Sequence, residues 1–150
     1  VILDQFIDFT RFRKNTFADS FKNGLVHPVM SHPFDDNLRK TLCETAKQLD
    51  LRVHDKGCVV TIEGPRFSTV AESKMFRQWG ADVINMSTAP EAMLANEVAI
   101  PYAAVAMSTD YDSWKEDEAP VTWDEILAVF DQNSHNVIKL LVNVIEELKE

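Results

Sequence analysis

Two carboxylates that stand two residues apart are the groups in this chain best placed for acid–base chemistry. Asp110 and Asp112 lie within Ser108–Trp114, directly after an apolar run that is typical of a buried strand. Apolar neighbours raise the pKa of a carboxyl group, so Asp110 is a candidate general acid. A protonated aspartate donates a hydrogen bond to a ring nitrogen, whereas an ionised one accepts a hydrogen bond from an amine. The pair therefore suits a 6-aminopurine.

The same segment has a second interpretation because it is strongly acidic. Residues 110–118 hold Asp110, Asp112, Glu116, Asp117 and Glu118 against Lys115 alone. A run of like charge is usually a solvated loop. Composition favours the two interpretations about equally, and only the position after a strand favours a site.

A second candidate segment, Thr61–Thr69, also follows an expected strand. The turn Gly64–Pro65 precedes Phe67, whose ring could stack on a planar base just before a helix begins. The alternative for Phe67 is a place in the core, where phenylalanine is more often found. For Arg66 we expect a structural ion pair, with Glu72 or with the glutamate three residues before it.

A third candidate segment, Ile84–Thr88, places two hydroxyl side chains between an expected strand and an expected helix. Backbone N–H groups at a helix N-terminus attract anions, so this junction suits a phosphate or a sugar hydroxyl. The alternative is that Thr88 only caps its helix. Ser87 and Thr88 can also divide the two roles between them.

Composition limits the classes of partner. The chain has 150 residues, with 24 acidic and 15 basic side chains and a formal net charge of −9. Binding to nucleic acid needs clustered Lys and Arg, so we expect no nucleic-acid partner. No apolar run approaches the roughly 20 residues of a membrane span, and no signal-peptide pattern is present. We therefore expect a cytoplasmic protein without a membrane partner.

Metal and cofactor chemistry has little support in the sequence. The common nucleotide-binding, hydrolase and zinc motifs are missing. His27 and His32, near two aspartates, form at most a weak metal pattern, and we expect neither a metal nor a cofactor. Cys43 and Cys58 have no disulfide or zinc spacing, which favours two small buried side chains.

Aromatic residues are concentrated near the start of the chain. Five of the nine phenylalanines fall within residues 6–21, among four basic residues. This mixture can bind single-stranded nucleic acid. Exposed aromatics on an acidic protein more often mark a subunit interface, which is the interpretation we prefer.

Strands and helices alternate along the chain, and they must position the three candidate segments. Apolar and β-branched runs predict strands at residues 1–4, 51–54, 57–62, 82–86 and 102–107. Helical spacing of apolar residues predicts helices at 36–49, 69–80, 88–98 and 122–148. Capping boxes introduce three of these helices, at Thr69, Thr88 and Thr122. The alternation indicates a single α/β domain over residues 1–150, with a mixed, largely parallel central sheet flanked by helices. Ligands of such sheets collect at the carboxyl ends of the strands, where the candidate segments lie.

Several runs of the chain resemble the 5′-methylthioadenosine phosphorylases, a family of the trimeric purine nucleoside phosphorylases. They are Asp4–Asp8, Thr61–Phe67, Ala71–Ser73, Trp79–Met86 and Ala106–Asp112. The resemblance implies the nucleoside phosphorylase fold, incomplete at its N-terminus, with residues 1–150 as the C-terminal part of the domain. It also implies phosphorolysis of 5′-methylthioadenosine, with inorganic phosphate as co-substrate, to adenine and 5-methylthioribose 1-phosphate.

The resemblance further implies roles for individual residues. Asp110 is expected to be the general acid at purine N7, Asp112 to accept from the 6-amino group, and Phe67 to lie against the base. Five residues are expected to line the site around base, ribose and phosphate, with the serine toward phosphate: Ile84, Asn85, Met86, Ser87 and Thr109.

Three more residues are expected around the 5′ end of the nucleoside. Trp123 and Ile126 would border the pocket for the alkylthio group. His27 would reach the corresponding pocket of a neighbouring subunit in a homotrimer.

Two alternatives stay open for the function. One is a related phosphorylase that prefers 6-oxopurine nucleosides such as methylthioinosine, although Asp110 in place of Asn disfavours it. The other is a non-catalytic, nucleoside-binding fragment. The family's phosphate loop precedes the region of resemblance, so we expect these 150 residues alone to lack activity.

Overall fold

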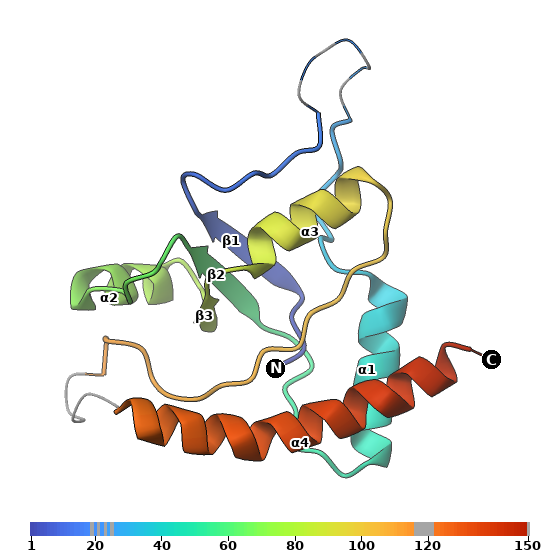
Figure 1. Cartoon of the computed structure of the whole chain (residues 1–150), viewed down its shortest axis with the longest axis vertical. Coiled ribbons are helices and arrows are strands. Elements are labelled where there is room, and N and C mark those ends of the chain that lie inside the picture. Colours follow the sequence, from blue (N-terminus) through green and yellow to red (C-terminus); the bar gives the residue numbers. More distant parts are fainter. Residues whose placement is uncertain (19, 21, 23, 25, 116–121, 150) are drawn as a thin grey trace.

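A three-stranded parallel sheet lies at the centre of the chain (Figure 1). In the computed structural model, β1 (Gln5–Phe9) pairs with β2 (Cys58–Ile62), and β2 pairs with β3 (Val83–Asn85). The structure describes residues 1–150 except residues 19, 21, 23, 25, 116–121 and 150. The side chains of Trp123 and Gln132 are also excluded from the description. The expected parallel sheet is confirmed.

The register of the sheet brings polar residues together at the carboxyl ends of the strands. Thr61 of β2 stands opposite Asp8 of β1 on one side and Asn85 of β3 on the other. Because the strands are parallel, the loops that follow them leave the sheet at the same edge. This edge is where a ligand site is expected in an α/β domain.

Four helices surround the sheet, and their bounds agree with the sequence prediction to within about two residues at most ends. They are α1 (Asp36–Gln48), α2 (Val70–Gln78), α3 (Thr88–Glu97) and α4 (Trp123–Glu147). The capping boxes at Thr69 and Thr122 are confirmed, since each hydroxyl accepts from the N–H three residues on and each glutamate accepts from the cap N–H. Gly80, with φ of +87°, follows the end of α2, as expected of a helix stop.

The third capping box, at Thr88, was wrong. The N-cap of α3 is Ser87, which makes no side-chain cap hydrogen bond, and Thr88 already lies inside the helix. The Thr88 hydroxyl instead accepts a hydrogen bond from the Asn85 amide. The Thr88 hydroxyl therefore bonds to a side chain three residues before it instead of to the N–H three residues after it, as the motif predicts.

Three expected strands form no ladder. Residues 1–4 and 102–107 meet only in an isolated antiparallel bridge, Ile2 to Val105. Residues 51–54 are joined to this region by one hydrogen bond, from the Ile2 N–H to the His54 carbonyl at 2.8 Å. A strand needs a neighbour of matching length, and the described part of the chain supplies none for these residues.

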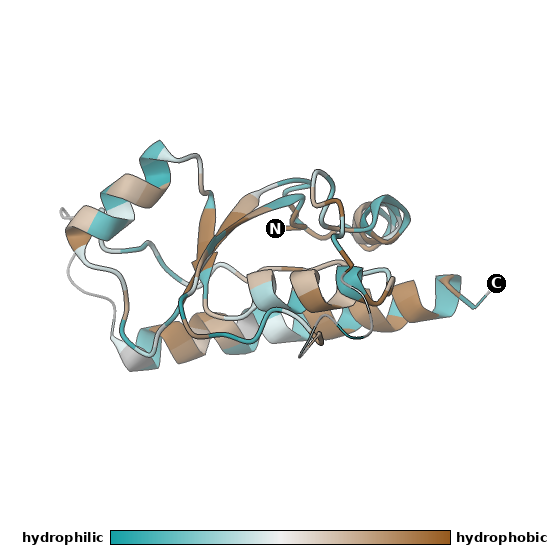
Figure 2. Cartoon of the chain, turned by 90° about the horizontal axis from the view of Figure 1, so that it is seen from above, coloured by the Kyte–Doolittle hydropathy of each residue, from teal (hydrophilic) through white to brown (hydrophobic). Residues whose placement is uncertain are grey.

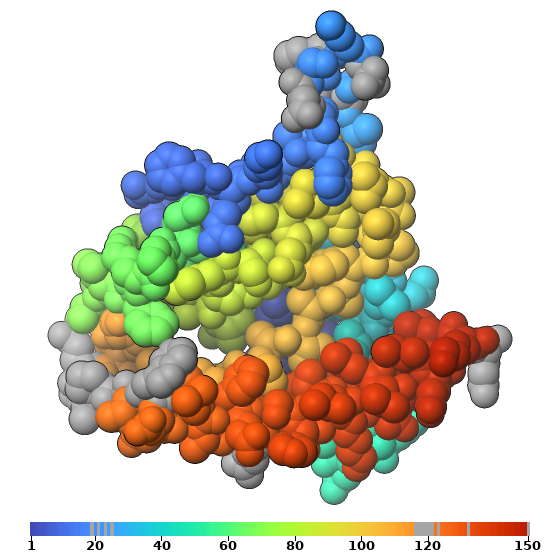
Figure 3. Space-filling view, viewed as in Figure 1, coloured from blue at the N-terminus to red at the C-terminus, as the bar shows by residue number. Residues whose placement is uncertain are grey.

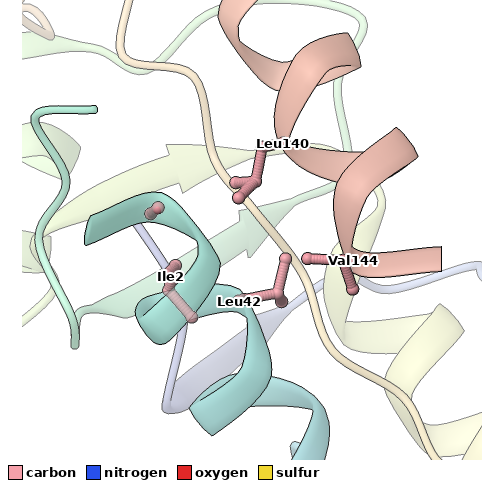
Figure 4. Packing of buried hydrophobic residues seen from close by; sticks show 5 residues of the cluster. Ile2, Leu42, Leu140 and Val144 are labelled. Carbon is pink, nitrogen blue, oxygen red and sulfur yellow. The ribbon is translucent and has the colours of Figure 1, made fainter. Parts of the chain in front are cut away.

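The core consists of three apolar clusters around the sheet. One lies between α1 and α4, where Ile2, Leu42, Leu140 and Val144 meet (Figure 4). A second includes Leu3, Phe34, Val59 and Ala92, and a third is formed by Val60, Ile62 and Phe76. Figure 2 shows that apolar residues are concentrated in the strands and along α4. The clusters hold the strand ends in place from both faces of the sheet.

No helix among the described residues is both long enough and apolar enough to cross a lipid bilayer.

Candidate functional site

The loops that follow the strands are fastened to one another at the carboxyl edge of the sheet. The Ser113 hydroxyl donates a hydrogen bond to the Ser68 carbonyl at 2.8 Å, and the Trp114 N–H donates to the Ser73 hydroxyl at 3.1 Å. Arg77 of α2 stacks on the Trp114 ring, 3.6 Å from its centroid. Figure 1 shows α2 and residues 108–115 on the side toward which the strands point. Two of the three candidate segments are thus brought together.

The third segment is held through Asn85, whose side chain is fixed at both ends of its amide. The Thr61 hydroxyl donates to Asn85 Oδ1 at 2.9 Å, and Asn85 Nδ2 donates to the Thr88 hydroxyl. Thr61 is fully buried and also accepts from the Ala89 N–H at 3.0 Å. The amide of Asn85 therefore has one orientation, set by β2 and α3.

Sequence reasoning missed Thr61 as a site residue. The signal was present, because a hydroxyl stands within the otherwise apolar run Cys58–Ile62. A buried polar group needs a partner, and that requirement points to a neighbouring polar side chain.

Met86 lies against the turn that follows β2. Gly64 has φ of +68°, and a Cβ at that position would stand 2.5 Å from Met86 Sδ. Any other residue at position 64 would therefore displace the methionine as well as strain the turn. Gly64 lets the half-buried Met86 side chain approach the backbone, beside the half-buried Ile84.

Arg66 is engaged by Glu72, as the sequence predicted. Its guanidinium donates two hydrogen bonds to the carboxylate, at 2.8 and 2.7 Å. These bonds, together with one from the Thr69 N–H, lower the pKa of Glu72 to about 2. These hydrogen bonds hold Arg66 at the start of α2, where its role is structural.

Phe67 is 67% exposed, so the alternative that placed it in the core was wrong. Next to it, Ser68 is 7% exposed, and its hydroxyl has no hydrogen-bond partner among the described residues. A buried hydroxyl without a hydrogen-bond partner is rare in a position that has only a structural role. Here such a hydroxyl lies next to an exposed aromatic ring.

Asp110 is exposed, and its carboxylate accepts a hydrogen bond from the Thr109 hydroxyl at 2.7 Å. Among the described residues, the apolar surroundings that we expected for Asp110 are not found, since its side chain is exposed. Asp112 is half-buried, and its carbonyl accepts from the Lys115 N–H at 3.2 Å. The rest of the acidic run, Glu116, Asp117 and Glu118, lies outside the described residues.

The first turns of α4 face the same region. Asn133 Nδ2 donates to the Ser108 carbonyl at 3.2 Å, which ties the helix to the segment of Asp110. Ile126 is half-buried, whereas Ser87 is exposed. Figure 3 shows a hollow between α2 and the start of α3 on one side and α4 on the other. The side chain of Trp123 lies outside the described part of the structure.

His27 is not brought to this region by the fold of one chain. It is exposed, in the segment between β1 and α1. Its expected role in a neighbouring subunit stays a prediction.

A cavity of about 250 Å³ lies elsewhere, among the described residues. It is lined by residues before α1, including His32 and Asp35, and by residues at and after the end of α3. Among the described residues, no three His, Cys, Asp or Glu side chains gather as metal ligands would. Cys43 and Cys58 are half-buried free thiols, and burial raises the pKa of both.

The chain is similar in sequence to curated proteins named S-methyl-5'-thioadenosine phosphorylase. It is 48% identical to the protein of Xenopus tropicalis over 99% of this chain and 54% of the relative. It is 49% identical to that of Pyrococcus horikoshii over 100% of this chain and 56% of the relative. The chain thus spans about half the length of the curated relatives that it matches.

Solved structures agree with these relatives. Methylthioadenosine phosphorylase of Schistosoma mansoni, in complex with adenine, has a TM-score of 0.90 and 33% identity over 99% of this chain and 58% of its own. A variant of the same enzyme, in complex with methylthioadenosine, has a TM-score of 0.88 and 32% identity over 99% and 57%. The model of the phosphorylase superfamily matches residues 1–146. Since that match covers almost the whole chain, the chain belongs to the phosphorylase superfamily.

Proposed function

We propose that this chain supplies the purine-binding part of a 5′-methylthioadenosine phosphorylase. The observation that carries the proposal is the fastening of the Asp110 segment to the strand ends through Ser113 and Trp114. It is supported by the names of relatives that are 48% and 49% identical over nearly all of this chain.

The proposed reaction is a substitution at C1′ of the ribose. An oxygen of inorganic phosphate forms a bond to C1′, and the C1′–N9 bond breaks with its electron pair moving into the purine. Asp110 gives a proton to N7, which neutralises the leaving base as adenine. Asp112 accepts a hydrogen bond from the 6-amino group. The products are adenine and 5-methylthioribose 1-phosphate, and no metal or cofactor is needed.

The other candidate residues define the shape of the site. In the proposal, Phe67 stacks on the base, and Ile84 and Met86 form an apolar wall. Asn85 acts as a positioning residue, because both ends of its amide are already used by Thr61 and Thr88. Ser87 and Thr109 supply hydroxyls, with Ser87 toward phosphate.

The 5′ end of the nucleoside is proposed to lie against Ile126 and Trp123. A methylthio group offers no strong hydrogen-bond partner, so an apolar pocket binds it better than it binds a 5′-hydroxyl. His27 of a neighbouring subunit completes this pocket in the proposal.

We propose that the segment between β1 and α1 forms the contact between the subunits of a homotrimer. Phe12 is 86% exposed and Phe17 is 62% exposed. Backbone N–H groups of Arg11 and Phe12 donate to Glu63 and lower its pKa, while Thr16 and Phe17 donate to Glu97. Two carboxylates thus hold an exposed aromatic arm in a defined conformation, which suits a contact with a second copy of the chain.

The test compares adenine with hypoxanthine as ligands of the chain and of its Asp110→Asn variant. By calorimetry, the unchanged chain is expected to bind adenine more tightly, and Asp110→Asn to shift the preference toward hypoxanthine by about 10- to 100-fold, the value of a charge-assisted hydrogen bond. Asp50→Asn removes the same charge from an exposed position where φ is +53°, which asparagine tolerates, and is the control.

The catalytic role of Asp110 is tested by measuring the rate of the reaction. Adenine release from methylthioadenosine and phosphate, measured on the intact protein that carries this chain, is expected to fall about 10²- to 10⁴-fold in Asp110→Asn. An unchanged preference and rate would contradict the role of Asp110. Tighter hypoxanthine binding by the unchanged chain would favour the 6-oxopurine alternative, and adenine binding without turnover would favour the non-catalytic one.

A further inference from the structure

The segment that carries both candidate aspartates is held on each side of them. Before them, the Ser108 carbonyl accepts a hydrogen bond from Asn133 of α4 at 3.2 Å. After them, the Trp114 N–H donates to the Ser73 hydroxyl of α2 at 3.1 Å. Figure 1 shows the segment passing between α2 and the start of α4. The two aspartates therefore lie on a short span, residues 109–112, whose position depends on both helices.

The helix α2 presents one face to this segment and another to the core. Ser73 and Arg77 are four residues apart, so they lie on the same face of the helix. Ser73 is 1% exposed and accepts from the Trp114 N–H, while the Arg77 guanidinium carbon lies 3.6 Å from the centroid of the Trp114 ring. Phe76 is buried in the apolar cluster that includes Val60 of β2. The position of the sheet is thus passed to Trp114 through α2.

A stack of rings and cations continues from Arg77 into the segment. The Tyr111 and Trp114 rings meet edge to face, with centroids 5.8 Å apart, and the Lys115 ammonium lies 3.6 Å from the Tyr111 centroid. A cation over an aromatic face is attracted by the ring, and a guanidinium also stacks on it. Of the four side chains in this stack, Arg77 is the one that comes from another element. It is exposed, so its contact with Trp114 is separate from the core.

We propose that Arg77 is a positioning residue for the purine subsite and acts through Trp114 on Asp112. Asp112 lies two residues before Trp114, and its carbonyl accepts from the Lys115 N–H at 3.2 Å, in the turn that presents the Trp114 ring. The stack holds this turn in one conformation before the base arrives, which reduces the ordering cost of binding. The proposal rests on the proposed function, in which Asp112 accepts from the 6-amino group.

Asp112 is a more direct target of the stack than Asp110. The Asp110 carboxylate is already engaged by the Thr109 hydroxyl at 2.7 Å, and Asp110 is closer in sequence to the contact with α4. Asp112 is closer to the contact with α2. Loss of the Arg77 stack is therefore expected to weaken the hydrogen bond to the 6-amino group more than the binding of the rest of the base.

The test compares adenine with unsubstituted purine, which has no 6-amino group, as ligands of the intact protein that carries this chain. By calorimetry, Arg77→Met is expected to raise the Kd of adenine about five- to tenfold and that of purine less than about twofold. Arg77→Lys keeps a cation over the ring and is expected to stay within about threefold of the unchanged protein for adenine. Gln78→Met makes the same replacement at the next exposed position of α2 and is the control. Equal losses for both ligands in Arg77→Met would overturn the proposal, because they indicate a general structural role.

A double-mutant cycle separates this proposal from the proposed function. Asp112→Ala is expected to weaken adenine binding, and Arg77→Met is expected to add less than about twofold to that loss, since both act on one hydrogen bond. Adenine binding that is unchanged in Asp112→Ala would contradict the proposed function. A loss in Asp112→Ala without a loss in Arg77→Met would overturn the positioning role alone.

Hydrogen exchange tests the anchor without any ligand. The Trp114 amide, which donates to Ser73, is expected to exchange at least about fivefold faster in Arg77→Met than in Gln78→Met. Equal exchange in the two variants would overturn the proposal, because Arg77 would then not hold the turn that carries Asp112.

Discussion

At the scale of single residues, the candidate site depends on polar groups that satisfy one another inside the fold. Thr61 is fully buried and links β2 to both β3 and α3 through one hydroxyl. Arg66 and Glu72 form the opposite kind of pair, an exposed one whose geometry is nonetheless bidentate. The buried hydrogen bonds of Thr61 hold the side chain of Asn85 in one orientation, and the Arg66–Glu72 pair holds the start of α2 in place.

Thr61→Val is expected to lower the free energy of unfolding by about 1–3 kcal/mol. The substitution keeps the shape of the side chain but removes the shortest hydrogen bond to Asn85 Oδ1 and leaves the Ala89 N–H without its acceptor. Urea denaturation measures the change. Thr41→Val removes a hydroxyl that bonds only within α1 and is expected to change the value by less than about 0.5 kcal/mol. Equal changes in the two variants would contradict the linking role of Thr61.

The Arg66–Glu72 pair predicts a pH dependence of stability. The pKa of Glu72 is about 2 in the folded chain, below the 4.5 of a free glutamate, so the unfolded state binds a proton first as the pH falls. The contribution of Glu72 is therefore present in full above about pH 4.5 and is lost as the pH falls toward 2. The stability difference between the chain and Glu72→Gln is expected to shrink between pH 6 and pH 3. A difference that is independent of pH would argue against the pair.

At the scale of elements, local signals and tertiary signals determine different things. The helices α1, α2 and α4 begin where the side chain of a cap residue accepts from the N–H three residues on, and in α2 and α4 a glutamate also accepts from the cap N–H. These signals lie within four residues of one another. The segment 102–107 has the composition of a strand, but its ladder requires neighbours that are distant in the sequence. For this reason the helices were predicted accurately, and several strands were not.

Adjacent leucines in α4 test which face of that helix is buried. Leu140 is 2% exposed and Leu141 is 42% exposed. Leu140→Ala is expected to destabilise the chain by about 2–5 kcal/mol through the cavity that it leaves between α1 and α4. Leu141→Ala is expected to change stability within about 0.5 kcal/mol. Thermal or urea denaturation of both variants measures the contrast, and similar losses would mean that α4 packs differently.

At the scale of the whole molecule, two surfaces remain available for further contacts. The segment after β1 carries the exposed rings of Phe12 and Phe17, and exposed apolar side chains such as Leu141 and Ile145 lie along α4. The first surface is the one proposed to contact a second copy of the chain. The acidic net charge of −9 leaves apolar area as the main source of affinity for both.

Association through the aromatic arm is expected to depend on Phe12. Phe12→Ser is expected to weaken trimer formation at least tenfold, because it removes a large exposed ring from the proposed contact. Light scattering coupled to size-exclusion chromatography measures the mass over a range of concentrations. Val98→Ser removes an exposed apolar side chain at the end of α3 and is the control. A chain that remains monomeric at every concentration would contradict the trimer.

The sequence by itself determined the α/β class with a largely parallel sheet, the four predicted helices, the Arg66–Glu72 pair and the segments that carry the candidate site, but not the strand Gln5–Phe9. These features follow from periodicity, caps and charges that lie close together along the chain. Only the tertiary structure decided the orientation of Asn85, the exposure of Phe67 and the pairing of residues 102–107 in an isolated bridge instead of a ladder. Each of these depends on a group that is distant in the sequence, such as Thr61, 24 residues before Asn85. Local patterns contain no information about which distant group will satisfy a buried amide or a strand edge.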